Sequence, residues 1–366
     1  MVIILDKKEF ADAVHTVARF AERRSATLPV LSGIALIAGD DGVKLRATNL
    51  ETGIDLKIAA TIKEPGVVAL PAQVLREITT SFSGTGTLTL EHSGDTVRIS
   101  SGTGKSTIKT LAYEDFPILP IPDAPTAEFS LPGALFRTLV SSVVSYASPS
   151  TVRPELASVL VAVEGGMMKA VSTDSFRLAE KKIALSGAVP AFSILIPARN
   201  AVDVIQTIPD TDIKITLDDH QCVFSWDQGL LVTRLVTASY PDYAQIIPKT
   251  SIAEATVLKK DFESVLKRTS IFSDTFQKVR MTFDPGEKKV TLAAQNADVG
   301  ESSESITGNL TGEGVELSFN HRYLSAPLGA IGTESINLSA SGIGRALIIR
   351  GTGDTSFLYL VMPMNQ

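Results

Sequence analysis

The stretch DKKEFADAVHTVARF, residues 6–20, recurs in similar form twice along the chain. The two other copies are SLPGALFRTLVSSVVSY at residues 130–146 and LKKDFESVLKRTSIF at residues 258–272. Apolar residues at helical spacing, such as Val14 and Val17 in the first copy, predict an amphipathic helix. Equivalent phenylalanines recur 126 residues apart, at Phe10, Phe136 and Phe262. A constant period predicts one structural unit repeated three times.

Three more sets of similar stretches follow each of these helices in the same order. The first set has alternating apolar positions around a turn, and it comprises ATNLETGIDL, STDSFRLAEKKI and AQNADVGESSESI. The second set predicts a short strand leading into a second helix, and it comprises VALPAQVLREI, ILIPARNAVDVI and LSFNHRYLSAPL. The third set ends each unit near a proline, in LAYEDFP, VTASYPDY and LYLVMP. Each unit is therefore predicted to be α+β, with two helices and several strands.

Two segments between the repeats are predicted to be connectors. ILPIPDAPTAEFS is rich in proline, and PKTSIAEATV follows the second repeat. They place domain boundaries near residues 124 and 249, so we expect domains at 1–124, 125–249 and 250–366.

The first helix has a start signal of its own. Asp6 stands before the helical pattern, and Glu9 follows three residues later. This spacing is typical of a capping box, in which each of the two side chains accepts a hydrogen bond from the backbone amide of the other residue. We expect the helix to begin directly after Asp6.

Composition predicts an ordinary globular chain. It has 366 residues, 20% of them charged, a net charge of −6 and a single cysteine, so no intrachain disulfide is expected. No apolar run reaches the roughly 18 residues that span a membrane. The N-terminal run MVIIL meets charged residues at once and is too short for a signal peptide. We therefore expect a cytoplasmic protein.

The segment SSGTGKSTIK, residues 100–109, contains part of a phosphate-binding loop motif. Gly104, Lys105 and Ser106 match the second half of G-x-x-x-x-G-K-[ST], but Ile99 stands where the first glycine is needed. The residues that follow, STIKTLA, predict a strand rather than the helix that such a loop requires. A hairpin turn is therefore expected, and a P-loop NTPase stays as an alternative that nucleotide binding would test.

The remaining histidine, cysteine and aspartate side chains indicate structural roles rather than catalysis or metal binding. His220 and Cys222 share a strand face, but no second pair completes a zinc site. Asp218 and the residues after it predict a hairpin turn, and Asp174 and Arg177, three residues apart, predict an ion pair. We expect no catalytic residue, no metal and no cofactor.

Seven stretches in order resemble one protein family. They are TLPVLSGI, TNLETGI, TLAYEDFP, STDSFRLA, YPDYAQIIPK, FNHRYL and the terminal VMPM. Over its full length the chain resembles the bacterial sliding clamps, the β subunits of DNA polymerase III. The resemblance implies an α+β fold of three clamp domains, which form half of a six-domain ring with helices lining the hole. It implies a non-catalytic processivity factor whose head-to-tail homodimer encircles duplex DNA without sequence preference, near the bacterial nucleoid.

The charge distribution fits a DNA path along the helices. The expected helical segments carry 15 Lys and Arg against 8 Asp and Glu, and the rest of the chain carries 19 against 32. A locally positive surface is what attraction to phosphates requires. The segments counted are 7–24, 72–82, 132–147, 198–208, 259–280 and 320–330. Expected DNA-binding residues are Arg23, Arg24, Arg76, Arg137, Arg199, Lys267 and Arg268.

The resemblance also implies a pocket for a short linear motif of partner proteins: the replicative polymerase, the clamp loader and other replication and repair proteins. Matching positions are Arg153, Pro154, Leu156, Thr173, Ser175, Phe176, Arg177, Leu178, Pro241, Ile246, Asn320, Tyr323, Leu360, Met362, Pro363 and Met364. The apolar members suit a leucine or phenylalanine anchor, and methionine adapts to several partners. Many relatives have Gly-His at Ser175-Phe176 and a basic residue at Asn365, so the preferred motif stays open. Phe176 offers no hydrogen bond, so a more apolar motif is expected.

The implied dimer contact joins the strand after the GKST turn to the third domain of the partner. Expected contact residues are Lys105, Ile108, Lys109, Ile271, Phe272, Glu301 and Glu304. Ser106 stands where the family often presents a large apolar residue, so dimer strength stays open. A clamp paralogue specialised outside bulk replication, such as a spare copy that avoids an inhibitor, is the second alternative. Gene context or deletion viability would separate it from the replicative clamp.

Overall fold

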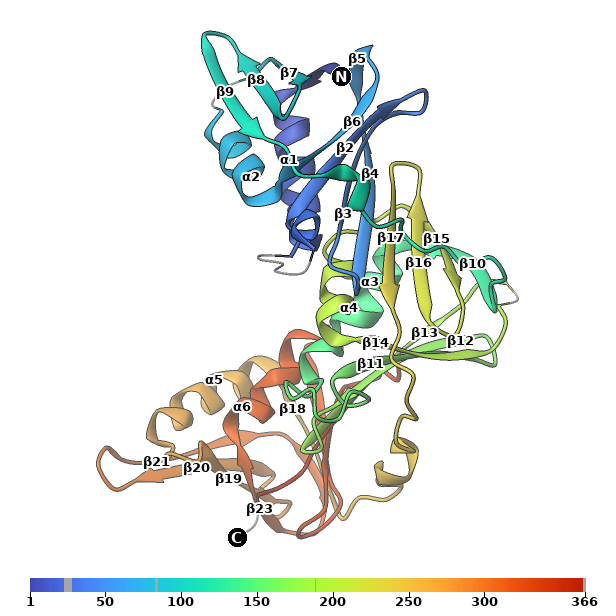
Figure 1. Ribbon diagram of the computed structural model, residues 1–366. Helices are drawn as coiled ribbons and strands as arrows, with labels where there is room; N and C mark the ends of the chain where they lie inside the picture. Colours follow the sequence, from blue (N-terminus) through green and yellow to red (C-terminus); the bar gives the residue numbers. More distant parts are fainter. Residues whose placement is uncertain (23–27, 83–84, 188, 365–366) are drawn as a thin grey trace. The chain divides into compact units, whose positions relative to one another are not determined.

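The computed structural model describes residues 1–22, 28–82, 85–187 and 189–364. The chain divides into two compact units, each containing two of the four sheets (Figure 1). Unit 1 comprises Met1–Arg137 and Arg199–Thr237, and unit 2 comprises Thr138–Ala198 and Ala238–Gln366. The middle repeat therefore contributes to both units.

Unit 1 contains an eight-stranded antiparallel sheet that joins the first two repeats. Strand β4 of the first repeat pairs with β17 of the second, with Ile54 opposite Leu231. The junction between these repeats is thus a continuous sheet. In sheet order the strands are β10 (Ala127–Pro132), β15 (Asp212–Leu217), β16 (Gln221–Trp226), β17 (Gly229–Arg234), β4 (Thr52–Ile58), β3 (Gly42–Thr48), β2 (Gly33–Gly39) and β6 (Gly66–Pro71).

The second sheet of unit 1 has five strands and ends in a free edge. Helices α1 (Lys7–Val17) and α2 (Ala72–Ser81) contact each other, and α1 also packs against β1, β3 and β4. Phe10, Val14 and Val17 are buried, as the helical periodicity predicts. In sheet order the strands are β5 (Ala60–Glu64), β1 (Val2–Asp6), β7 (Thr87–Ser93), β8 (Thr96–Ser101) and β9 (Gly104–Lys109).

Unit 2 contains a nine-stranded sheet that joins the second and third repeats in the same way. Strand β13 of the second repeat pairs with β26 of the third, with Leu178 opposite Leu360. In sheet order the strands are β14 (Phe192–Pro197), β11 (Ser158–Glu164), β12 (Met167–Thr173), β13 (Arg177–Ala184), β26 (Phe357–Val361), β25 (Leu347–Gly351), β24 (Ser335–Ala340), β18 (Ala253–Leu258) and β22 (Asn309–Gly312).

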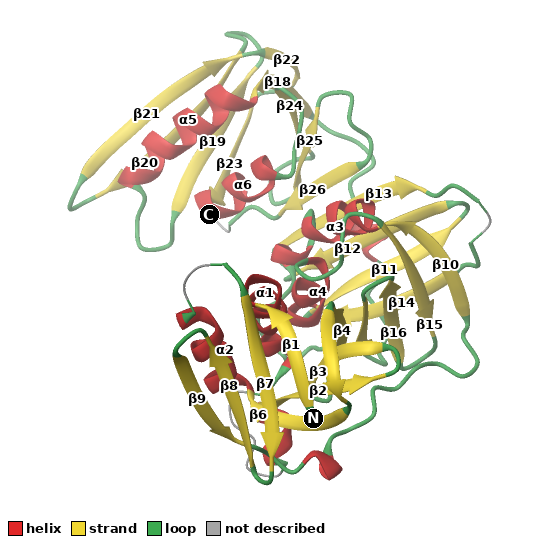
Figure 2. Cartoon of the chain, turned by 90° about the horizontal axis from the view of Figure 1, so that it is seen from above, coloured by secondary structure: helices red, strands yellow, loops and turns green. Residues whose placement is uncertain are grey.

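The second sheet of unit 2 has four strands. Helix α5 (Lys259–Thr269) packs on β20 and β21, and α6 (His321–Ser325) contacts β23 (Figure 2). In sheet order the strands are β21 (Gly300–Thr307), β20 (Lys289–Asn296), β19 (Lys278–Asp284) and β23 (Val315–Asn320).

The helices of the middle repeat are α3 (Gly133–Ser141) and α4 (Ala198–Ile205). Phe136 on α3 packs against Phe224 on β16, with 5.1 Å between the ring centroids. Each repeat thus has a first helix and, after a strand, a second helix, so the predicted α+β organisation of the repeat is confirmed. Short 3-10 helices complete the chain: η1 (Ala18–Phe20), η2 (Pro29–Ser32), η3 (Tyr113–Asp115), η4 (Val144–Tyr146), η5 (Tyr243–Ile246), η6 (Ser270–Phe272) and η7 (Ala326–Gly329).

Two local predictions need correction. The helical segment expected at 259–280 is too long, because α5 and η6 end by Phe272, and Lys278 and Arg280 lie on β19. The shortened segment loses two positive residues, Lys278 and Arg280, and one negative residue, Asp274, so its excess of positive charge is smaller by one than predicted. The capping box is only half formed. Asp6 Oδ1 accepts hydrogen bonds from the amides of Lys8 and Glu9, whereas Glu9 Oε1 accepts one from Ala59 N at 3.1 Å.

The turn between the two strands of each repeat is built alike in the first two copies. Thr48 Oγ1 donates to Thr52 O at 2.8 Å, and Thr173 Oγ1 donates to Arg177 O at 2.7 Å. The third residue of each turn has a positive φ, 71° at Leu50 and 77° at Ser175. These turns fix the chain at the point where each unit's large sheet crosses from one repeat to the next.

Candidate partner-binding site

The residues that the family resemblance assigns to a partner pocket all fall in unit 2, where the β12–β13 turn lies beside the C-terminal strand. Asp174 Oδ1 accepts from the amides of Phe176 and Arg177, both at 3.0 Å. Ser175 has a φ of 77°, in the left-handed region that favours glycine. The turn presents Phe176 with 61% of its surface exposed.

Arg177 holds the base of this turn against two aromatic rings. Its guanidinium carbon lies 4.6 Å from the Tyr323 ring centroid and 5.3 Å from that of Tyr146, and Nε donates to Asp174 Oδ2 at 2.8 Å. The predicted ion pair with Asp174 is therefore confirmed. Burial alone would lower the pKa of Arg177, but the hydrogen bond to Asp174 and the charges near it raise it. Burial raises the pKa of Tyr146 to about 12. Arg177 is thus held in a fixed position at the base of the β12–β13 turn.

The C-terminal tail continues the pairing beyond β26. Met362 N donates to Phe176 O at 2.8 Å, and Met364 N donates to Ser318 O on β23 at 2.8 Å. Asn320, another expected pocket residue, caps α6 through a hydrogen bond from Arg322 N at 2.9 Å. The tail is therefore fixed to both sheets of unit 2.

The segment after Pro241 is attached to the same sheet by one tyrosine. Tyr243, on η5, is buried, and its hydroxyl donates to Glu180 Oε2 at 2.6 Å. Lys182 Nζ lies 2.8 Å from Glu180 Oε1. Burial, followed by the bond to Glu180, raises the pKa of Tyr243. Ile246, at the end of η5, is 54% exposed.

The expected pocket residues separate into a buried floor and an exposed rim. Leu178, Leu360 and Leu156 are at most 4% exposed, so in the free chain they are covered. The exposed members are Arg153, Pro154, Ser175, Phe176, Pro241, Ile246 and Met362. The remaining members are buried or half-buried: Thr173, Arg177, Asn320, Tyr323, Pro363 and Met364. Asn365 lies outside the described residues. An anchor can reach the floor only if the rim moves, and methionine is suited to such movement.

The residues expected to contact DNA differ in how free their charge is. Arg137 donates to Ile205 O at 2.8 Å and also binds Ile208 O and Asp210, so its guanidinium caps the end of α4. Arg268 is paired with Glu304, which lowers the pKa of that carboxyl. Arg199 and Lys267 are exposed, and Arg76 Nη2 donates to Gln73 Oε1 at 2.9 Å. Arg23 and Arg24 lie outside the described residues.

The residues expected at the dimer contact lie on the free edges of the two smaller sheets or beside them. Lys105 and Lys109 are exposed on β9, but Ile108 is only 4% exposed and faces the interior of its own unit. The expected contact at Ile108 stays a prediction, made by the strand β9 rather than by this buried side chain. Ile271 is 66% exposed, Phe272 is half-buried, and Glu301 is exposed on β21. Glu304 is already engaged by Arg268.

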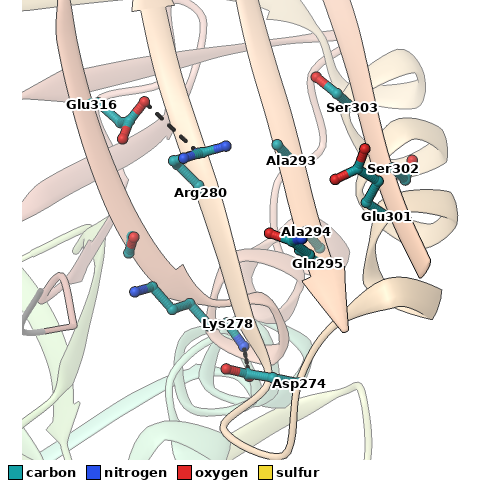
Figure 3. A pocket seen from close by; sticks show the side chains of 11 residues that line it. Asp274, Lys278, Arg280, Ala293, Ala294, Gln295, Glu301, Ser302, Ser303 and Glu316 are labelled. Carbon is teal, nitrogen blue, oxygen red and sulfur yellow. Dashed lines mark hydrogen bonds and ion pairs between the residues drawn. The ribbon is translucent and has the colours of Figure 1, made fainter. Parts of the chain in front are cut away.

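A separate depression of about 780 Å³ lies on the four-stranded sheet. Figure 3 shows Arg280 directed towards Glu316, at 3.8 Å, with Lys278, Asp274 and Glu301 nearby. Two cations face three carboxylates, so its charge favours neither DNA nor an acidic peptide. None of the expected partner-pocket residues lines it.

The segments whose residues resemble nucleotide-binding or metal-binding motifs form turns and hairpins in the structure. The GKST letters lie in the β8–β9 hairpin and at the start of β9, so the predicted turn is confirmed and no helix follows. Asp218 Oδ1 accepts from His220 N at 2.8 Å and closes the β15–β16 hairpin. Cys222 is buried. Within the described ranges, no cluster of three or more His, Cys, Asp or Glu residues could hold a metal ion, and no helix could cross a membrane.

Sequence reasoning missed three residues that build this site. Tyr146 contacts Arg177, and the hydrogen bond between Tyr243 and Glu180 fixes η5. Tyr243 lies in the quoted YPDYAQIIPK stretch, but its partner stands 63 residues earlier, and no local pattern connects the two. The available signal was Glu180 itself, a carboxylate that follows Leu178 and Ala179 on a strand.

Comparison with known proteins covers almost the whole chain. Three family models match: the N-terminal domain of the DNA polymerase III beta subunit at residues 1–120, the central domain at 130–242 and the C-terminal domain at 244–365. The chain is 28% identical to the beta sliding clamp of Synechococcus elongatus, with 100% of this chain and 99% of that protein covered. It is 26% identical to that of Bacillus subtilis, with the same coverage.

The fold is also similar to solved structures. The crystal structure of the DNA polymerase sliding clamp from Bacillus subtilis matches with a TM-score of 0.94 at 25% identity, covering 100% of this chain and 99% of that one. Sequence and fold agree over all three repeats, and the chain therefore belongs to the DNA polymerase III beta subunit family.

Proposed function

We propose that this chain is a DNA sliding clamp, a non-catalytic processivity factor that works as a closed homodimeric ring. The observation that carries the proposal is a pair of free sheet edges. Strand β9 ends the five-stranded sheet and β21 ends the four-stranded sheet, and each pairs on one side only within the described residues. A free edge is a template for another chain. Joining β9 of one protomer to β21 of another would make a nine-stranded sheet, the size of the large sheet of unit 2.

The edges also have complementary charge. Lys105 and Lys109 are exposed on β9, and Glu301 is exposed on β21. Ile271 and Phe272 lie near this edge, since the Phe272 ring comes within 3.7 Å of a Cβ built on Gly300 at the start of β21. A heterologous contact of this kind closes into a ring if the rotation between protomers allows it. Three domains per chain, with boundaries proposed near 124 and 249, would give six per ring.

DNA binding is proposed to run along the helices and to be independent of sequence. Arg199 and Lys267 offer exposed charge, and Arg23, Arg24 and Arg76 are assigned by position. Arg137 and Arg268 contribute less, because each is already paired with a carboxylate. Contacts to phosphates alone hold a protein on DNA without reading bases. In a bacterium this work lies in the cytoplasm, at the nucleoid.

Partners are proposed to bind through a linear motif at the rim formed by Phe176, Ile246 and Met362. Exposed aromatic and methionine side chains next to one another are typical of adaptable binding surfaces. The replicative polymerase, the clamp loader and other replication or repair proteins would compete for this site.

The decisive experiment compares DNA topologies. After loading by the cognate clamp loader, the protein should remain on a nicked circle and leave the same DNA once it is linearised. Equal loss from both substrates would contradict the ring. A chain that loads and retains polymerase activity on long templates acts as the replicative clamp, whereas a specialised paralogue would fail to support growth as the sole copy.

A further inference from the structure

The pocket floor of unit 2 has a counterpart in unit 1. Leu178, Leu360 and Ile348 stand opposite one another on β13, β26 and β25, and we call them the apolar row of unit 2. The corresponding positions on β4, β17 and β16 form the apolar row of unit 1, which comprises Gly53, Val232 and Val223. Each row begins directly after the repeated turn.

A backbone hydrogen bond confirms the correspondence between the rows. In unit 1, Arg234 N donates to Glu51 O at 2.8 Å, and in unit 2, Met362 N donates to Phe176 O at 2.8 Å. Both bonds join the fourth residue of the turn to the residue two positions beyond the row. The two rows are therefore the same structural site in successive repeats.

The row of unit 1 is occupied by the chain's own connector. Leu119 is 6% exposed and packs in a cluster with Val223 and Val232. A Cβ built on Gly53 would come within 2.3 Å of Leu119 Cδ2, so Leu119 lies directly over this glycine. A leucine from the connector thus fills the place above the row.

The connector of unit 2 takes a different path. Tyr243 follows Pro241 by two residues, as Leu119 follows Pro117, but its hydroxyl binds Glu180 at 2.6 Å. Glu180 stands two residues beyond Leu178 on the same strand, so it lies on the same face. Lys182 also pairs with Glu180. The Tyr243 ring also lies 5.9 Å from Lys169 Nζ, and Lys169 stands opposite Lys182. The tyrosine is therefore held near Glu180 and Lys182, further along β13 than Leu178.

We propose that the Tyr243–Glu180 hydrogen bond is a positioning device that holds η5 beside the apolar row of unit 2, so that an anchor can reach the row once the side chains of the rim move. Leu119 occupies the equivalent place in unit 1, so the row of unit 1 is not available to an anchor. The inference rests on the proposed partner-binding function. With Tyr243 fixed, Ile246 at the other end of η5 stands exposed on the rim.

The test measures binding of a polymerase-derived peptide with leucine and phenylalanine anchors, by calorimetric titration well below the melting temperature. Tyr243→Phe removes only the hydroxyl, and we expect affinity to fall about ten-fold or more, as the loss of a hydrogen bond to a charged group predicts. Tyr243→Leu rebuilds the arrangement of unit 1 and should weaken binding further. Glu180→Gln keeps an acceptor oxygen for the Tyr243 hydroxyl and should therefore retain most of the wild-type affinity.

Tyr240→Phe is the matched control. The Tyr240 hydroxyl is buried and has no hydrogen-bond partner within the described part of the chain, and its ring centroid lies 6.4 Å from that of Tyr243. Its removal should leave peptide binding unchanged. A twin peptide with both anchors replaced by alanine should bind none of the variants.

The outcomes separate the inference from the function on which it rests. Wild-type binding with unchanged affinity in Tyr243→Phe and Tyr243→Leu would overturn the positioning role alone. Equal losses in Tyr243→Phe and Tyr240→Phe would also overturn it, because they would mark general loosening of the segment. A wild-type chain that binds neither peptide would overturn the proposed partner site and the positioning role together.

Discussion

The backbone amide of Met362 donates a hydrogen bond of 2.8 Å to the carbonyl oxygen of Phe176. The bond fixes the first residue of the tail to the turn that presents the most exposed aromatic side chain of the candidate pocket. Met362 and Phe176 are 39% and 61% exposed, so both remain free to contact a partner. The tail and the turn can therefore be tested as two parts of one surface.

Deletion of Met362–Gln366 should weaken binding of the anchor peptide about ten-fold or more. Burial of one leucine-sized side chain contributes roughly 1.5–3 kcal/mol, and about 1.4 kcal/mol corresponds to a ten-fold change. Calorimetric titration measures the change, and light scattering should show an unaltered dimer. If the affinity stays the same while the dimer persists, the tail is not part of the site.

Replacement Phe176→His should change motif preference more than overall affinity. Phenylalanine offers only apolar contact, whereas imidazole also offers a hydrogen bond. We expect the wild-type chain to prefer peptides with an apolar residue beside the anchor, and the variant to lose this preference. Competition between two peptides that differ at that position measures the ratio. An identical ratio for both proteins would rule out contact between Phe176 and the motif.

Replacement Ser175→Gly should stabilise unit 2 by about 1 kcal/mol. Ser175 has a φ of 77°, and a side chain at such an angle costs on the order of 1–3 kcal/mol that glycine avoids, partly offset by the greater freedom of glycine in the unfolded chain. Leu50→Gly, with a φ of 71°, is the matched change in unit 1. Urea unfolding measures both. Destabilisation by Ser175→Gly would mean that the Ser175 side chain makes a favourable contact that outweighs the strain.

Replacement Ser106→Leu should strengthen the proposed dimer, and Ile271→Glu should weaken it. Ser106 is half-buried on the edge strand β9, on the same face as Ile108, so a leucine there would add apolar surface at the edge where the partner is proposed to bind. Ile271 is 66% exposed beside the other edge. A carboxylate buried at an interface without a partner opposes association. Sedimentation velocity across a concentration series gives the dissociation constants. Val152→Glu, at an 87% exposed position that lies on neither edge strand, is the control.

His321 should make the stability of unit 2 depend on pH below neutrality. Burial, followed by the charge of Arg322, lowers the pKa of His321 in the folded chain. The unfolded chain, with a pKa near 6.5, then takes up the proton first, so stability falls as pH drops below about 6.5. His321→Gln should show a smaller loss of melting temperature between pH 7.5 and about 5.5. His220→Gln, on an exposed hairpin turn, serves as the control; a loss as large in His321→Gln as in the wild-type chain would contradict the assignment.

Local signals in the sequence predicted much of the fold. Asp6 stands directly before α1, as predicted, and the repeated phenylalanines lie on the first helix of each repeat. The glycines after Ser101 lie in the β8–β9 hairpin, also as predicted. Partners distant in the sequence could not be predicted. Arg137 is assigned to DNA because it lies on one of the predicted basic helices, but it donates a hydrogen bond to Ile205 O at the end of α4, 68 residues later in the sequence. The hydrogen bond between Tyr243 and Glu180 could not be predicted for the same reason, because its two residues are 63 positions apart in the sequence and meet only in the folded chain.

The pairing of β4 with β17 and of β13 with β26 also has a consequence for how the chain folds. The repeats that the sequence suggests are not independent folding units, because each large sheet closes only when strands from two repeats are present. A fragment ending near residue 124 would leave the edge of β4 without β17, and a fragment beginning near 250 would leave β26 without β13. Such edges promote aggregation. During synthesis, the first large sheet can close only after residues up to Arg234 have left the ribosome, so the strands of the first repeat must wait until most of the second repeat has been made.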